Sequence, residues 1–362
     1  MLKVSQPQEE EMAKPALTTE VFQPRVTSLE PFAAAPERNL DFLRAVAVLL
    51  VVICHLFGAS ERTRRMPLPH ELGSIGVLIF FVHTSLVLML SMQRMKILNA
   101  ATFVRSFYVR RFFRIYPLSI ITVVLVFSLG VPEHARALFQ SPSRLEWVSN
   151  ILLAQNLART RSAISPLWSL PWEVQMYLAL PFIFVVLRSI RQRATVVVLA
   201  SVLAALLNLS GSHVVFKLLA FTPCFLGGVL SYVLLRKNRF LSARLWPPTL
   251  FLLLAGYLAY RSWNPQGYYV SWVMCTALGI AIPQFCDLPN GWLAKAAHCI
   301  AKYSYGIYLV HVPMIWLAFV RFDSLPSVVS LLIALVSSAG LAFAAYHLVE
   351  APMISFGRRL SR

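Results

Sequence analysis

Long apolar stretches recur along the chain, separated by short polar and basic segments. A stretch of about 17 to 25 apolar residues is enough to cross the hydrocarbon core of a bilayer as a helix. The stretches begin near Leu40, Ile75, Leu118, Leu167, Ala194, Lys217, Thr249, Tyr269, Ser304 and Val328. This pattern predicts an all-α, polytopic integral membrane protein with about ten transmembrane helices, because helices satisfy their own backbone groups within lipid.

The composition supports the same class. Hydrophobic residues make up 58% of the chain and charged residues only 13%, and the mean hydropathy is +0.66, which excludes an ordinary soluble domain. The net charge of +18 is spread over the segments between the apolar stretches. We therefore interpret it as a topology signal and as attraction to membrane lipids or an anionic cytoplasmic ligand, with no nucleic-acid binding expected.

The chain divides into a polar N-terminal segment and a membrane domain. Residues 1–38 are polar, rich in proline and contain an acidic run, which predicts a disordered cytoplasmic tail before a transmembrane domain over residues 39–362. With the N-terminus inside, the loops expected on the cytoplasmic side carry more Lys and Arg than the outer loops. This asymmetry predicts that both termini are cytoplasmic.

Arg44 and His55 are the only strongly polar side chains on an otherwise apolar helix expected from Phe42 to Phe57. A separation of eleven residues is about three turns, so both side chains lie on one face, about 16 Å apart, and we expect them to face the same cavity. Ionisable groups within hydrocarbon mark functional interiors. The alternative is that Arg44 reaches the membrane interface and His55 hydrogen-bonds a neighbouring helix.

A basic and aromatic segment precedes the third apolar stretch. It contains Arg110, Arg111 and Arg114, followed by Tyr116 and Pro117. Guanidinium groups bind phosphate oxygens bidentately, and aromatic rings can stack on an adenine ring. Arg114 is the strongest candidate because it lies nearest the hydrocarbon. The alternative is a basic cytoplasmic loop that sets the topology and contacts lipid head groups.

Glu173 is the one carboxylate placed well inside an apolar stretch. Near the start of a helix the dipole favours its ionised form, so it could pair with a histidine or accept a proton from a hydroxyl. Trp168 and Ser169 come just before it, and aromatic side chains form platforms for sugar rings. The alternative places Glu173 and Trp168 in an interfacial aromatic belt.

Two more histidines, His83 and His311, fall within apolar stretches. His311 shares a helix face with Tyr308, three residues earlier, and both histidines are candidates for contacting substrate. The alternative is that each hydrogen-bonds a neighbouring helix. No two His or acidic residues have the spacing of metal ligands, so we predict no metal site.

Taken in order, these segments resemble the acyltransferase-3 family of integral membrane O-acyltransferases, over about residues 38–360. The arginine followed eleven residues later by histidine is the most specific element, together with the Trp-Ser-Leu-x-x-Glu segment. The matching segments are Asn39-Leu-Asp41-Phe-Leu-Arg44 through His55, Gly76-Val-Leu-Ile-Phe80-Phe81-Val, Arg110-Arg111-Phe-Phe-Arg114-Ile-Tyr-Pro117, Trp168-Ser169-Leu-Pro-Trp-Glu173-Val-Gln-Met-Tyr177, Ser304-Tyr-Gly-Ile-Tyr308-Leu-Val-His311-Val-Pro313 and Glu350-Ala-Pro352.

The resemblance implies transfer of an acetyl or other short acyl group from cytoplasmic acyl-CoA, with acetyl-CoA the expected co-substrate, to a hydroxyl. The acceptor is usually a sugar of a glycan, a lipid-linked oligosaccharide or another glycosylated compound. By position, His55 would be the catalytic base, Arg44 its partner or a thioester contact, and Glu173 a contact of the acceptor or of His55. The segment 110–116 would hold CoA. No tightly bound cofactor is implied, and the expected location is the bacterial inner (plasma) membrane.

One position departs from the family pattern. After Gly76 to Val82 the family usually continues with a Ser-Gly pair, whereas this chain has His83-Thr84-Ser85. We expect His83 to lie near the centre, where it positions the acceptor or acyl group or simply packs. The competing class is a proton-coupled transporter or flippase, because buried Arg, His and Glu also serve carriers. A carrier typically has paired halves with matching helix breaks, and no such pairing is evident in the sequence.

Overall fold

The computed structural model describes residues 37–59, 67–95, 99–131, 141–210, 219–235, 239–265 and 269–361. The tail predicted over residues 1–38 lies outside this part of the chain, apart from Glu37 and Arg38, which already belong to the first helix. The described residues are helical or irregular, and the extended pairing within them is one isolated bridge between Leu241 and Phe285.

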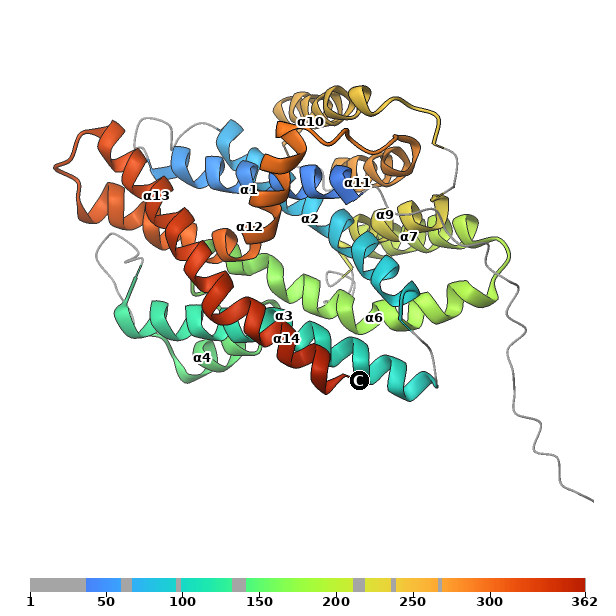
Figure 1. The fold of residues 1–362 in the computed structure, drawn as a ribbon, viewed down its shortest axis with the longest axis horizontal. Coiled ribbons are helices and arrows are strands. Elements are labelled where there is room, and N and C mark those ends of the chain that lie inside the picture. The colour runs from blue at the N-terminus through green and yellow to red at the C-terminus, as the bar shows by residue number, and fades with distance from the viewer. Residues whose placement is uncertain are drawn as a thin grey trace, which may run out of the picture. The chain divides into compact units, whose positions relative to one another are not determined.

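The longer helices follow one another along the chain as Figure 1 shows. They are α1 (Glu37–Ala59), α2 (Pro67–Gln93), α3 (Ala100–Leu129), α4 (Arg144–Ile151), α6 (Leu170–Ser189), α7 (Arg193–Ser210), α9 (Thr222–Leu234), α10 (Trp246–Trp263), α11 (Tyr269–Ala281), α12 (Trp292–Trp316), α13 (Ser327–Ala345) and α14 (Ala351–Leu360). The short helix α5 (Gln155–Ala158) and the 3-10 turns Ser165–Ser169, Ala243–Leu245 and Ile282–Gln284 connect them. Two π-helical turns, Leu317–Arg321 and Tyr346–Glu350, extend α12 and join α13 to α14.

Seven helical segments in the described ranges are long and apolar enough to cross a membrane. They are Glu37–Ala59, His70–Gln93, Ala100–Leu129, Ser165–Ser189, Arg193–Ser210, Trp292–Arg321 and Ser327–Leu360. The apolar segments Thr222–Leu234 and Tyr269–Gln284 are shorter, and the start expected at Lys217 lies outside the described residues. The all-α membrane class is confirmed, whereas the number of about ten spans is not.

Two of the spanning helices begin earlier than the apolar pattern predicted. Helix α3 starts at Ala100 and not near Leu118, because Asn99 caps it by accepting a hydrogen bond from the Thr102 N–H at 2.7 Å. The basic segment is therefore helical and not a loop. Helix α12 likewise starts at Trp292, twelve residues before the expected Ser304. In both helices, turns that carry polar and basic residues precede the apolar run.

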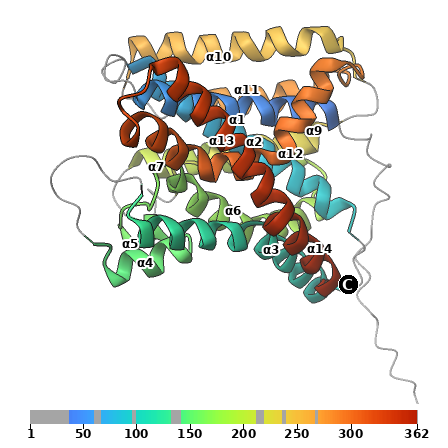
Figure 2. The same cartoon turned by 60° about the vertical axis from the view of Figure 1, so that its left-hand side comes forward.

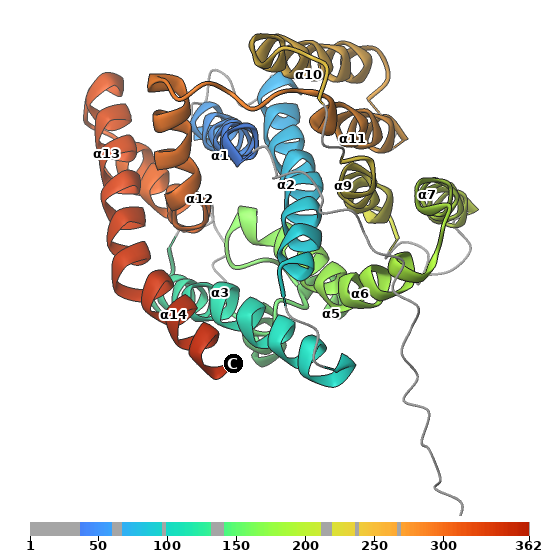
Figure 3. The same cartoon turned by 45° about the vertical axis from the view of Figure 1, so that its right-hand side comes forward.

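Helix α2 is apolar on nearly all sides and is mostly buried, as expected for a helix surrounded by other helices. It packs against α1, α9 and α6, and Figure 3 shows it between α1 and α12 on one side and α9 and α7 on the other. Glycine allows the close crossings. A Cβ at Gly76 would lie 2.6 Å from the Ala47 carbonyl of α1, and one at Gly228 of α9 would overlap the Val82 carbonyl.

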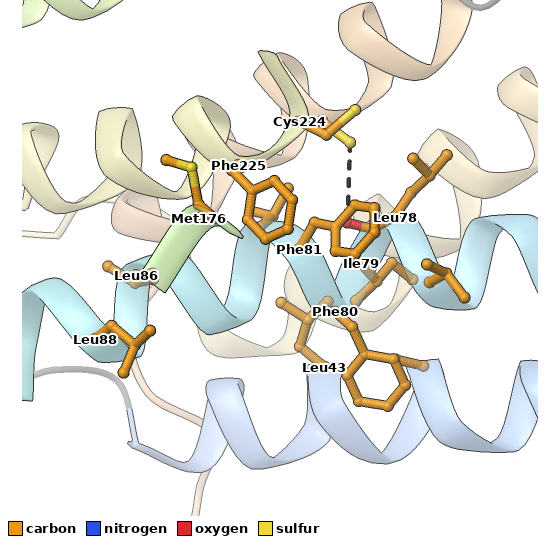
Figure 4. Close-up of a cluster of buried hydrophobic side chains, with 14 of the residues drawn as sticks. Leu43, Leu78, Ile79, Phe80, Phe81, Leu86, Leu88, Met176, Cys224 and Phe225 are labelled. Carbon is orange, nitrogen blue, oxygen red and sulfur yellow. Dashed lines mark hydrogen bonds between the residues drawn. The ribbon is translucent and has the colours of Figure 1, made fainter. Parts of the chain in front are cut away.

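Large apolar side chains fill the spaces around α2. Figure 4 shows Phe80 pointing toward α1 and Leu43, and Phe81 pointing toward α9. The rings of Phe81 and Phe225 stack with their centroids 4.3 Å apart. Because lipid tails are as apolar as these side chains, close packing stabilises this core more than exclusion of water does.

The start of α1 is fixed to the segment before α12. Arg38 forms an ion pair with Asp287 at 2.9 Å. The buried side chain of Asn39 donates to the Cys286 carbonyl at 3.0 Å and accepts from the Leu288 N–H at 3.0 Å. These bonds fix where α1 lies along α12, and therefore also fix the positions of the side chains farther along α1.

The end of the chain returns to α3. Helix α14 packs against α3, and Figure 2 shows the two side by side. A Cβ at Gly357 would lie 2.7 Å from the Phe113 Cβ, so the small residue allows the close contact. The π-helical turn before α14 carries Glu350, which this packing brings to the basic segment of α3.

Candidate active site

Three arginines from two helices line one cavity. Arg44 comes from α1, and Arg111 and Arg114 come from α3, where a spacing of three residues places them on one face. The cavity has a volume of about 80 Å³. We call it the basic cavity. Its wall is completed by Phe80, His83, Thr84, Val87, Leu88, Ile115, Leu170, Glu173, Tyr177, Ser304, Tyr305 and Tyr308.

Each arginine of the basic cavity has a different environment. The Arg44 Nε donates to Ser304 Oγ at 2.5 Å. Arg114 pairs through Nη1 with the buried carboxylate of Glu350 at 2.8 Å. The guanidinium of Arg111 lies 6.0 Å from the centre of the Phe107 ring, and its buried Nε has no hydrogen-bond partner among the described residues. An unpaired buried donor is costly, so Arg111 favours an incoming anion.

Two residues of the basic segment point elsewhere. The Arg110 Nε donates to Ser361 Oγ at 2.8 Å, and the Tyr116 hydroxyl donates to the Leu152 carbonyl at 3.1 Å. Neither residue lines the basic cavity. This stretch of α3 therefore faces α14 and α4 as well as the cavity, and the assignment of Arg110 and Tyr116 to the CoA site stays a prediction.

Glu173 and His83 lie on the wall of the basic cavity. The Glu173 Oε2 accepts a hydrogen bond from the Tyr177 hydroxyl at 2.7 Å. His83 is buried, and its Nδ1 has no partner within the described ranges. With three arginines against Glu173 and the adjacent Glu350, the ionised groups of this region carry a net positive charge, which attracts an anionic ligand.

His55 lines a second cavity, which lies between α1, α2, the 3-10 turn at Ser165 and α12. We call it the histidine cavity, and its volume is about 550 Å³. Trp168, which is 37% exposed, lines it together with Ser165 and the buried Tyr308. His311 lies directly behind His55, with ring centroids 4.9 Å apart.

Hydrogen bonds assign the protons of this histidine pair. The His311 Nδ1 lies 2.9 Å from the Ile307 carbonyl, to which it donates, so its Nε2 is an acceptor in the neutral ring. That Nε2 lies 3.2 Å from the His55 Nδ1, which also lies 2.9 Å from the Val51 carbonyl. His55 therefore carries its proton on Nδ1, and its unprotonated Nε2 faces Ser165 Oγ at 2.8 Å. This is the geometry of a general base.

Arg44 and His55 do not line the same cavity, contrary to the expectation from their helix face. Arg44 lines the basic cavity and His55 the histidine cavity, while Tyr308 lines both. The Tyr308 hydroxyl donates to the Pro166 carbonyl at 2.7 Å and lies 2.7 Å from Ser169 Oγ. The three turns between Arg44 and His55 leave room for this tyrosine to reach between them.

Comparison with known proteins identifies the family of this chain. A family model described as an acyltransferase domain matches residues 37–347. The chain belongs to the acyltransferase-3 family. It is also 32% identical over 171 residues to Acyltransferase MdmB of Streptomyces mycarofaciens, a match that covers 43% of this chain and 41% of that protein. The chain thus matches less than half the length of this relative, and no solved structure matches it.

In this acyltransferase-3 protein, Ser169 and His311 contact side chains that line the cavities. Ser169 is buried and lines neither cavity, but it contacts Tyr308. His311 is fully buried and contacts His55. Among the described residues, no group of three His, Cys, Asp or Glu side chains is arranged to hold a metal ion.

Sequence reasoning assigned no role to several groups around these cavities. Tyr177 lies four residues after Glu173, a helical spacing that could have predicted its hydrogen bond to that carboxylate. Ser165 directly precedes the recognised Pro166-Leu-Trp168-Ser169 segment, but nothing local relates it to His55. Tyr305 and Ser304 reach the basic cavity only because α12 packs against α1.

Proposed function

We propose that this membrane acyltransferase moves an acetyl or other short acyl group from cytoplasmic acyl-CoA to a hydroxyl of a glycan, glycolipid or other glycosylated acceptor. The observation that carries the proposal is the meeting of two cavities at Tyr308. One contains three arginines, and the other contains an imidazole with an unprotonated Nε2. A donor rich in phosphate and an acceptor that must lose a proton need these two environments.

The basic cavity is suited to the phosphates of CoA. Arg111 offers a buried donor without a partner, and the positive charge shared by Arg44 and Arg114 favours an anion. Planar guanidinium groups bind phosphate oxygens through paired hydrogen bonds. Arg44 and His55 are about 16 Å apart along α1. An extended pantetheine arm has a comparable length, so a CoA whose nucleotide is held by the arginines reaches His55 with its thioester.

The histidine cavity is suited to the acyl-transfer step. The His55 Nε2 takes the proton of the attacking hydroxyl, and His311 holds the ring in the correct tautomer through the His55 Nδ1. Attack on the thioester carbonyl forms a tetrahedral intermediate, which collapses with loss of the CoA thiolate. The Trp168 ring, partly exposed in this cavity, offers a face on which a sugar can stack.

Sidedness follows from the distribution of positive residues and is part of the proposal. With both termini cytoplasmic, the basic segment of α3 lies near the inner surface and the end of α1 that carries His55 lies toward the outer surface. Cytoplasmic acyl-CoA thus enters from the side of the arginines. The acceptor enters the histidine cavity from the other side, so CoA itself does not cross the membrane.

The test is acyl transfer in native membranes, which contain the acceptor. Membranes of a deletion strain carrying the wild-type protein, His55→Ala or His298→Ala are incubated with acetyl-CoA labelled in the acetyl group. His298 is the control because its exposed ring contacts Asp41, far along the chain from His55, and lines neither cavity. We expect base-labile label in the glycan or lipid fraction for the wild type and His298→Ala, and none for His55→Ala. Absence of label from all three proteins would refute the function, equal labelling by all three would refute His55 as the base, and uptake of substrate without ester formation would favour a transporter.

A further inference from the structure

Ser165 is placed as a nucleophile beside a base. Its Oγ lies 2.8 Å from the unprotonated Nε2 of His55, and the residue is exposed within the histidine cavity. The His55 Nδ1 in turn contacts His311 at 3.2 Å. A hydroxyl bonded to an imidazole that a third group orients is the arrangement that activates serine nucleophiles.

The backbone around Ser165 is held by bonds that do not involve its side chain. The Pro166 carbonyl accepts from the Tyr308 hydroxyl at 2.7 Å, and the Leu167 carbonyl accepts from Gln155 Nε2 at 2.8 Å. The Leu167 N–H also donates to the Ile164 carbonyl at 3.1 Å. Ser165 therefore starts a rigid turn, and its hydroxyl is aimed at His55 without itself fixing that turn.

Direct transfer to an acceptor requires Ser165 to move aside. The His55 Nε2 has one lone pair, and the Ser165 O–H already occupies it. An acceptor hydroxyl must displace Ser165 from this nitrogen before His55 can take its proton. If Ser165 reacts first, the same bond becomes the first step of catalysis and no displacement is needed.

We propose, on the basis of the function proposed above, that Ser165 is the acyl-carrying nucleophile of a two-step transfer. In the first step Ser165 Oγ attacks the thioester carbonyl while its proton passes to His55 Nε2. The carbon–sulfur bond then breaks, and His55 returns the proton to the leaving sulfur. The products are an ester on Ser165 and free CoA thiol, so atoms and charge balance.

The second step repeats the chemistry with the acceptor. The acceptor hydroxyl enters the space left by CoA, gives its proton to His55 Nε2 and attacks the ester carbonyl of Ser165. The proton returns to Ser165 Oγ as the bond to the acyl group breaks. The donor and the acceptor thus use one imidazole in turn, which a single unprotonated Nε2 permits.

The experiment uses the full chain in lipid nanodiscs with labelled acetyl-CoA and no acceptor. We compare the wild type with Ser165→Ala, Ser165→Cys and Ser74→Ala, by intact mass and by peptide mapping after rapid quenching. Ser74 is the matched control because it lies on the wall of the same cavity but bonds the His70 carbonyl at 3.3 Å. We expect one acetyl group on the peptide that contains Ser165 in the wild type and in Ser74→Ala.

We expect Ser165→Ala to form no acetyl-enzyme in the nanodiscs and, in the native-membrane assay described above, to lose transfer to the acceptor by about a thousandfold or more, as is usual when a nucleophile is removed. Ser165→Cys should instead accumulate a thioester that hydroxylamine cleaves. Absence of label at position 165 in both the wild type and Ser165→Cys would overturn the inference, as would full transfer by Ser165→Ala. If Ser165 is not labelled but His55→Ala still transfers no acyl group in the membrane assay, the proposed function is supported and only the serine intermediate is refuted.

Discussion

Replacing Arg111 by glutamine tests the donor site most specifically. The Arg111 Nε is buried without a partner and its guanidinium lines the basic cavity, so a phosphate there gains a charge-assisted hydrogen bond. Such a bond contributes about 1.5 to 3 kcal/mol, which corresponds to about 10- to 150-fold in affinity. We therefore expect Arg111→Gln to weaken acyl-CoA binding by that factor, measured by calorimetry in nanodiscs.

Arg110 is the matched control, because it is adjacent in sequence and equal in charge but bonds Ser361 outside the basic cavity. Arg110→Gln should change acyl-CoA affinity by less than about threefold, as expected for a charge that only adds to the general field. Thermal unfolding of both variants shows whether the fold is intact. Equal losses of acyl-CoA affinity in the two variants would refute the reasoning and indicate that the basic segment binds lipid head groups or sets the topology.

Three further predictions concern the groups around these cavities. Arg114→Met leaves the buried Glu350 carboxylate unpaired, and we expect it to lower the free energy of unfolding by about 3 kcal/mol in thermal unfolding. The double variant Arg114→Met/Glu350→Met should regain most of this stability. Equal stability of the single and double variants would contradict the prediction. Glu173→Gln removes a negative charge from the wall of the basic cavity, and we expect it to tighten acyl-CoA binding by about tenfold in a fluorescence titration. Glu173→Asp keeps the charge and should bind acyl-CoA like the wild type. Weaker binding by Glu173→Gln would show that the phosphates bind elsewhere. His311→Ala removes the group that orients His55, and we expect it to lower kcat by about a hundredfold with the KM for acyl-CoA unchanged. A rise in KM without a change in kcat would show that His311 does not position His55.

The parts of the site that the sequence predicted are those set by local helix geometry. The placement of Arg44 and Glu173 within apolar helices follows from their neighbours in sequence. The shared face of Arg111 and Arg114 follows from a spacing of three residues. For the same reason the all-α membrane class could be predicted from apolar length alone.

The remaining features depend on contacts between distant segments. Ser165 and His55 are 110 residues apart in sequence, and their contact requires the 3-10 turn to reach the end of α1. Arg114 meets Glu350 only because α14 packs against α3. The separation of Arg44 from His55 by Tyr308 depends on how α12 packs against α1. Periodicity predicts which face a side chain occupies, but not which helix covers that face.

The number of spans was the least predictable part of the fold. Short apolar helices such as α9 and α11 give the same local pattern as spanning segments. Their length, and not their hydrophobicity, separates them from the seven longer segments. Capped amphipathic extensions such as the start of α3 move a helix boundary well beyond its apolar run.

The central claim is that donor binding and acyl transfer belong to different cavities. The most direct measurement takes His55→Ala in nanodiscs and records both acyl-CoA affinity and acyl transfer to acceptor at saturating donor. The account predicts an affinity within about twofold of wild type, because His55 does not line the basic cavity, together with transfer below about a tenth of the wild-type rate. Wild-type transfer by His55→Ala, or a loss of acyl-CoA binding equal to that of Arg111→Gln, would contradict it.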